Sequence, residues 1–89
     1  MVREYKTNLP GQEVIARAKK FFAERVPHYG AYLESEGASY ATFRGQGGEE
    51  IAIAVVEGGP GTRVRASSPM YEQAIGRFFS TLPALGQDD

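Results

Sequence analysis

The chain of 89 residues contains no cysteine. Disulfide bonds, thiolate nucleophiles and zinc sites built on thiolate ligands are therefore excluded. The chain has a single histidine, His28, and general-base work would need an acid or a nucleophile held against it. Glu24 lies about one helical turn earlier, but a carboxylate near a histidine is commonplace. The sequence therefore predicts no catalytic residue, no metal site and no cofactor.

An excess of basic residues is also missing. Ten Lys and Arg stand against eleven Asp and Glu, for a net charge of −1. Nucleic-acid-binding modules usually carry a basic excess, so we expect no nucleic-acid partner. No stretch approaches the ~20 apolar residues that span a bilayer, and charged residues follow Met1 where a signal peptide would be apolar. We therefore expect no membrane partner and a cytoplasmic location.

The length is enough for one domain with one core. Hydrophobic residues make up 42% of the chain, and five Phe and five Tyr are among them. A chain of this size buries only roughly 60–65% of its unfolded surface, so its stability is modest unless it oligomerises. We predict a single domain over residues 1–89, with a core over residues 2–83 and a frayed tail over residues 84–89.

An alternating apolar run over residues 49–57 predicts the central strand of an antiparallel sheet. Its large side chains share one face and its small ones the other: Ile51, Ile53 and Val55 against Ala52, Ala54 and Val56. We expect the large face to meet the helices. The flat, small-residue face is then either lightly covered or pressed against a partner.

Two amphipathic helices are predicted. The first, over residues 10–25, ends before Pro27, and its apolar face carries Val14, Ile15, Ala18, Phe21, Phe22 and Arg25. In the second, Ser68 is the N-cap, Pro69 opens the helix and Pro83 ends it, with an apolar stripe of Tyr71, Ile75, Phe78, Phe79 and Leu82. Because a helix hides one stripe, one member of each doubled phenylalanine is expected near the margin.

Further strands are predicted over residues 2–7, 29–35, 38–45 and 62–67. Glu36-Gly37 predicts a tight hairpin in which the glycine supplies a positive φ. The glycine-rich stretches 45–48 and 58–61 lack the spacing and the lysine of phosphate loops, which favours turns. Sequential hairpins favour an antiparallel sheet, and both helices are buried most economically on one face of it. The predicted fold is α+β in the order β-α-β-β-β-β-α.

This order resembles a reduced helix-grip domain, the superfamily of the Bet v 1, START and polyketide-cyclase-like domains. A short strand, a break at Leu9-Pro10, a helix with Glu13-Val14, a meander and a closing amphipathic helix carry the resemblance. The chain lacks the second short helix, the additional strands and the long final helix of those domains. The resemblance implies binding of an apolar ligand where a pocket exists between sheet and helices, and it transfers no residue role.

Aromatic side chains are the candidates for contact with a small apolar or amphipathic ligand. They are Tyr32, Tyr40, Phe22 and Phe78, and the alternative for them is packing in the core or at its boundary. Tyrosines also serve at partner surfaces, because aromatic residues are enriched at protein interfaces.

Three arginines are the candidates for contact with an anion or an acidic partner. Arg63 and Arg65 share one face of the strand predicted over residues 62–67, and Arg44 is expected on the same side of the sheet. Guanidinium groups offer forked donors that suit carboxylate and phosphate. The alternative is cross-strand pairing with Glu49, Glu50 or Glu57 on a solvated face.

Three functions are compatible with these patterns. The leading hypothesis is a small non-catalytic interaction domain that self-associates as a homodimer. The second is binding of a small apolar ligand in a reduced helix-grip pocket. The third is an enzyme that holds an anionic substrate with Arg63, Arg65 and a tyrosine.

Overall fold

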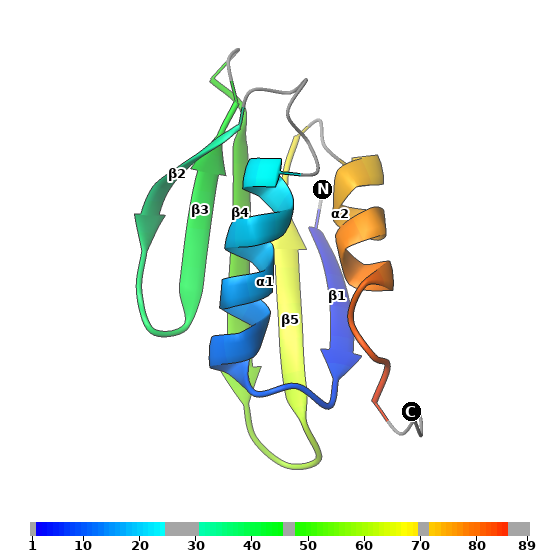
Figure 1. Ribbon diagram of the computed structural model, residues 1–89. Coiled ribbons are helices and arrows are strands. Elements are labelled where there is room, and N and C mark those ends of the chain that lie inside the picture. The colour runs from blue at the N-terminus through cyan, green and yellow to red at the C-terminus, as the bar shows by residue number, and fades with distance from the viewer. Residues whose placement is uncertain (1, 25–30, 46–47, 70–71, 86–89) are drawn as a thin grey trace.

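A five-stranded antiparallel sheet and two helices form the computed structural model, which describes residues 2–24, 31–45, 48–69 and 72–85. The elements are β1 (Val2–Thr7), α1 (Gly11–Glu24), β2 (Tyr32–Glu36), β3 (Tyr40–Arg44), β4 (Glu50–Glu57), β5 (Thr62–Ser67) and α2 (Glu72–Ser80). The strand order is β1-β5-β4-β3-β2, so the first strand pairs with the last (Figure 1). The predicted α+β class, element order and antiparallel sheet are confirmed.

Both helices lie on one face of the sheet (Figure 1). Helix α1 crosses the middle of the sheet, and α2 lies beside it on the side of β1, where the rings of Phe79 and Tyr5 stack with centroids 5.1 Å apart. Within the described part of the chain, no element covers the opposite face. Both helices thus bury their single apolar stripes against the same face of the sheet.

The alternation of β4 decides which side is the core. Ile51 and Ile53 are fully buried beneath the helices and Val55 nearly so. Ala54 and Val56 are exposed on the other face, Val56 to 65% of its surface. The predicted two-faced strand is therefore confirmed, with its large residues on the helix side.

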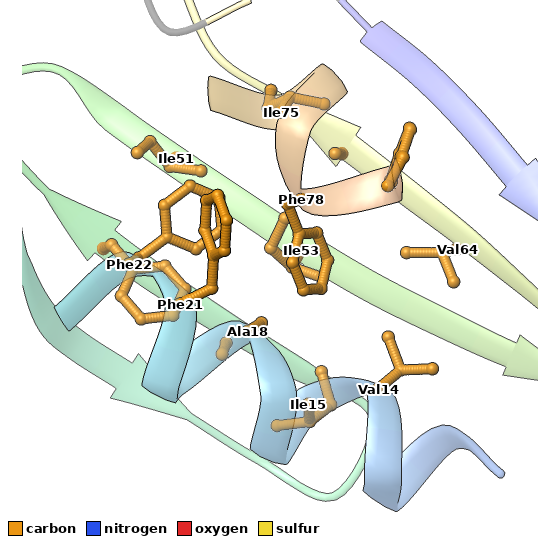
Figure 2. Close-up of a cluster of buried hydrophobic side chains, with 14 of the residues drawn as sticks. Val14, Ile15, Ala18, Phe21, Phe22, Ile51, Ile53, Val64, Ile75 and Phe78 are labelled. Carbon is orange, nitrogen blue, oxygen red and sulfur yellow. The ribbon is translucent and has the colours of Figure 1, made fainter. Parts of the chain in front are cut away.

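Phenylalanines from both helices fill the centre of the core (Figure 2). The rings of Phe21 and Phe22 each lie 5.6 Å from the ring of Phe78, measured between centroids, and Phe22 also packs against Phe43 at 5.1 Å. The expectation that one member of each doubled pair lies near the margin is wrong, since Phe21, Phe22, Phe78 and Phe79 are all buried. Each helix packs against the sheet and against the other helix, so two adjacent positions on each helix are covered.

A carboxylate from the sheet caps helix α1. The backbone N–H of Gly11, the first residue of the helix, donates to Glu57 Oε2 at 2.5 Å, where the positive end of the helix dipole favours a negative charge. A Cβ on Gly11 would lie 2.9 Å from Val55 Cγ2, so the close approach of helix and strand requires glycine. The carboxylate of Glu57 is therefore bound to the start of α1, on the helix side of the sheet.

Two buried threonines join the ends of β1 and β5. Thr7 and Thr62 are direct neighbours across the strand pair. The hydroxyl of Thr7 donates to the carbonyl of Pro83 at 2.6 Å, and the hydroxyl of Thr62 donates to the carbonyl of Leu9 at 2.6 Å. These bonds tie the segments before α1 and after α2 to the sheet.

Replacement of Thr62 by valine is expected to lower the free energy of unfolding by about 1–3 kcal/mol, because the carbonyl of Leu9 loses its donor inside the protein. Urea unfolding followed by circular dichroism measures the change. Thr42→Val is the matched control, since the Thr42 hydroxyl is on the surface and its bond to Ser35 is 3.5 Å long. Equal effects of the two substitutions would contradict the role of the buried bond.

The β2–β3 hairpin differs from its prediction. The strands are shorter than predicted, and residues 37–39 connect them, with the N–H of Gly37 donating to the carbonyl of Tyr40. Among the described glycines only Gly48, Gly59 and Gly61 have positive φ, so Gly37 does not supply one. The ring of Tyr40 occupies the space instead, because a Cβ on Gly37 would lie 2.3 Å from that ring.

Helix α2 and the chain after it also differ from their predictions. Helix α2 is described from Glu72 onward, and Pro69, which was predicted to open the helix, is not helical. Residues 70 and 71 lie outside the described part. The helix ends at Ser80, before the predicted Pro83. Ala84 forms a bridge with Thr7, and the N–H of Leu85 donates to the carbonyl of Lys6, so these two residues are not frayed. Residues 86–89 lie outside the described part.

Candidate functional site

The uncovered side of the sheet, called the open face here, is a five-stranded surface that no described element covers. The strand registers place its side chains in rows across all five strands. They are Val2, Glu4 and Lys6 of β1; Arg63, Arg65 and Ser67 of β5; Glu50, Ala52, Ala54 and Val56 of β4; Tyr40, Thr42 and Arg44 of β3; and Tyr32 and Ser35 of β2.

Small and apolar side chains form the middle of the open face. Ala54 lies between Tyr40 on β3 and Arg65 on β5, and Ala52 lies between Thr42 and Ser67. Large apolar residues surround this flat centre with much of their surface in solvent: Val56 at 65%, Tyr32 at 56%, Val2 at 51% and Tyr40 at 42%. The face is thus flat in the middle and apolar at several points around it.

The four aromatic candidates do not form one site. Tyr32 and Tyr40 are exposed on the open face, whereas Phe22 and Phe78 are fully buried between the sheet and the helices. The two phenylalanine rings pack against each other (Figure 2), which leaves no room for a ligand between them. Only the tyrosines are available to a binding partner.

Arg44 is neutralised by carboxylates. Its guanidinium donates to Glu34 through two hydrogen bonds, from Nε at 2.6 Å and from Nη2 at 2.9 Å, and Nη2 lies 3.7 Å from the carboxylate of Glu50. Pairing with Glu50 was one of the predicted alternatives. Glu34 was not predicted as a partner of Arg44. It lies at a bulge in β2, between Leu33 and Ser35, and regular strand alternation does not predict where the side chain of a bulged residue lies.

The hydrogen bonds from Arg44 hold the pKa of Glu34 below its usual value. Desolvation opposes this shift, and the opposite charge of Arg44 adds to the lowering. A lowered carboxyl pKa stabilises the fold above the unfolded-state pKa, and this contribution is lost as the pH falls through the folded-state pKa.

We expect the pKa of Glu34 to rise toward that of a free glutamate in Arg44→Gln. A pH titration of the Glu34 carboxyl carbon by NMR measures it in both proteins. Arg65→Gln is the control, because Arg65 forms no ion pair within the described residues, and it should leave the titration of Glu34 unchanged. Identical titration of Glu34 with and without Arg44 would contradict the ion pair.

Arg63 and Arg65 differ from Arg44. Neither forms an ion pair with any residue that the structure describes. Glu4 is the cross-strand neighbour of Arg65 without closing a salt bridge, and the carboxylate of Glu57 is bound to the first turn of α1. The three arginines therefore do not act together. The guanidinium groups of Arg63 and Arg65 lie on the open face without an ion-pair partner among the described residues.

Lys6 joins Arg63 at one end of the open face. The two residues are direct cross-strand neighbours of β1 and β5, on the same side of the sheet. Both line a shallow hollow of about 180 Å³ beside the β4–β5 hairpin, together with Val56, Gly58, Pro60, Gly61 and Thr62. We call Lys6, Arg63 and this hollow the cationic corner. Lys6 was not a candidate in the sequence, because nothing local shows that the first strand pairs with the last.

The described residues offer neither a metal site nor a membrane-spanning helix. Among the residues with described placement, no group of three or more His, Asp or Glu side chains lies close enough to hold a metal ion. In that same part of the chain, neither helix is long and apolar enough to cross a membrane. His28 and Tyr29 lie outside the described residues, as do Arg25 and Tyr71 of the predicted helix stripes.

Comparisons with known protein families, with curated proteins and with solved structures found no match. The resemblance to helix-grip domains therefore stays a prediction from the order of the elements.

Proposed function

We propose that this chain is a small interaction domain that self-associates by packing the open faces of two copies against each other. The observation that carries the proposal is the outer row of the central strand β4. Ala52, Ala54 and Val56 follow one another there, where a strand with one solvated face alternates apolar and polar residues. An apolar row in the middle of an uncovered sheet is typical of a surface that has a partner.

The size of the face suits a protein partner. Five strands about 4.8 Å apart and six residues at about 3.3 Å each project an area of about 500 Å². Because side chains stand up from this plane, the accessible area is larger and approaches the ~600–1,000 Å² that each partner contributes to a specific interface. The flat alanine centre allows a second sheet to pack at the usual separation of about 10 Å.

The near balance of charges on the open face is also compatible with packing against a second copy. Its four cations are Lys6, Arg44, Arg63 and Arg65, and the three carboxylates on or beside it are Glu4, Glu34 and Glu50. A face so close to neutrality repels its own copy only weakly, and a small domain gains buried apolar surface from the contact.

Pairing through the sheet edges is less favourable. The edge of β1 is partly occupied by Ala84 and Leu85, which pair with it. Strand β2 contains a bulge and two glutamates, Glu34 and Glu36, and both bulges and charges discourage edge-to-edge pairing. The open face is therefore the surface that best suits a second copy.

Sedimentation velocity over a wide range of protein concentrations tests the proposal. We expect a reversible shift from monomer to dimer as the concentration rises. A single monomeric species up to the concentrations used for NMR would overturn self-association.

A further inference from the structure

We propose that the cationic corner binds a phosphate group, presented by a small phosphate monoester. The site lies within one chain, at one end of the open face, and does not rest on the proposed self-association. Because a second copy packed on the open face would cover this corner, phosphate and the second copy would compete for it. It is formed by the end of β1, the start of β5 and the hairpin that connects β4 to β5.

Two like charges at directly opposed positions form the basis of the site. Lys6 and Arg63 are paired across β1 and β5, where facing side chains lie roughly 5 Å apart and like charges are destabilising. Within the described residues neither cation has an ion-pair partner. The fold therefore places two cations side by side, and neither is neutralised by a described carboxylate. A bound anion would offset their repulsion.

The chemistry of the pair favours phosphate. A phosphate monoester carries a charge of about −1.5 to −2 at pH 7, which matches two cations better than the single charge of a carboxylate. Its oxygens accept the forked donors of Arg63, and Lys6 supplies a second, more mobile charge.

The hollow beside the pair limits the size of the ligand. Its volume of about 180 Å³ is below the ~300–1,000 Å³ of pockets that enclose a drug-sized molecule. Val56 and Pro60 form an apolar part of its lining. The site thus fits a phosphate with a short organic group, whose carbon atoms would contact these two side chains.

The hairpin keeps this hollow open. A Cβ on Gly58 would meet nothing within 4 Å, so the backbone borders free space there. Gly61 has a φ of 112°, and a Cβ on it would lie 2.7 Å from the carbonyl oxygen of Thr7. The hairpin can therefore approach the end of β1 and border the cationic pair only with glycine at this position.

Titration with inorganic phosphate, followed by ¹H–¹⁵N NMR at constant ionic strength and at a protein concentration at which sedimentation shows a monomer, tests the site. We expect saturable shifts at Lys6, Gly58, Gly61, Thr62 and Arg63. Lys6→Gln and Arg63→Gln should each weaken binding about tenfold, as for loss of a charge-assisted hydrogen bond. Both side chains are exposed, so the fold should remain intact, which the dispersion of the same spectra shows.

Arg77→Gln is the matched control, because it removes one exposed positive charge from α2, on the other side of the sheet. It should leave phosphate binding unchanged. Shifts that do not saturate, or equal weakening by Arg77→Gln and Arg63→Gln, would overturn the site.

Propyl phosphate distinguishes a monoester from the free ion. It should bind roughly fivefold more tightly than inorganic phosphate, because its chain covers Val56 and Pro60. Val56→Ser should reduce this advantage. Equal affinity for the two compounds would overturn the assignment of a monoester.

Discussion

Replacement of Phe22 by alanine is expected to lower the free energy of unfolding by about 3–5 kcal/mol. The side chain is fully buried, and its ring packs against those of Phe21, Phe43 and Phe78. Small domains have a total stability of about 5–15 kcal/mol, so this loss removes a large part of it. The cavity would open where the two helices and the sheet meet, at the centre of the core.

Urea unfolding at a fixed protein concentration measures the effect, because the proposed self-association would make the free energy of unfolding depend on concentration. Ile53→Val provides a smaller step, expected to cost about 0.5–1.5 kcal/mol, if Phe22→Ala fails to fold. An unfolding midpoint of Phe22→Ala equal to that of the unmodified protein would contradict the central position of this ring.

Replacement of Ala54 by arginine is expected to weaken self-association at least about 100-fold while leaving the fold intact. Ala54 lies in the flat centre of the open face, between Tyr40 and Arg65. A long charged side chain there would hold two sheets apart, and its burial beside Arg65 would leave a charge without a partner. A 100-fold change corresponds to about 2.7 kcal/mol.

Ala16→Arg is the matched control, since Ala16 is exposed on α1, on the opposite side of the sheet. Sedimentation compares the two variants with the unmodified protein, and circular dichroism checks their folding. A dimer that survives Ala54→Arg, or one that Ala16→Arg disrupts equally, would place the contact elsewhere.

Local periodicity was enough to predict the sheet and the core. The alternation of Ile51, Ile53 and Val55 with small residues determines which side of β4 the helices cover, and the helical spacing of Val14 through Phe22 determines the buried stripe of α1. Each of these patterns lies within one element, so the sequence of that strand or helix alone is enough to predict it.

Pairings between distant segments were not predictable in this way. Lys6 and Arg63 become neighbours through the register between the first and the last strand. The ion pair of Arg44 with Glu34 depends on the bulge in β2. The role of Glu57 as the cap of α1 depends on the distance between a helix and a strand. Such features arise from packing, and a one-residue change of register would turn every side chain of a strand to the other face.

Isotope-filtered NMR on a mixture of ¹³C-labelled and unlabelled protein tests the proposed self-association most directly. If two open faces pack together, the methyl groups of Ala52, Ala54 and Val56 will show intermolecular contacts with protons of the same face in the other copy. Intermolecular contacts confined to the helices, or to the edge of β2, in a sample that sedimentation shows to be dimeric would contradict the account.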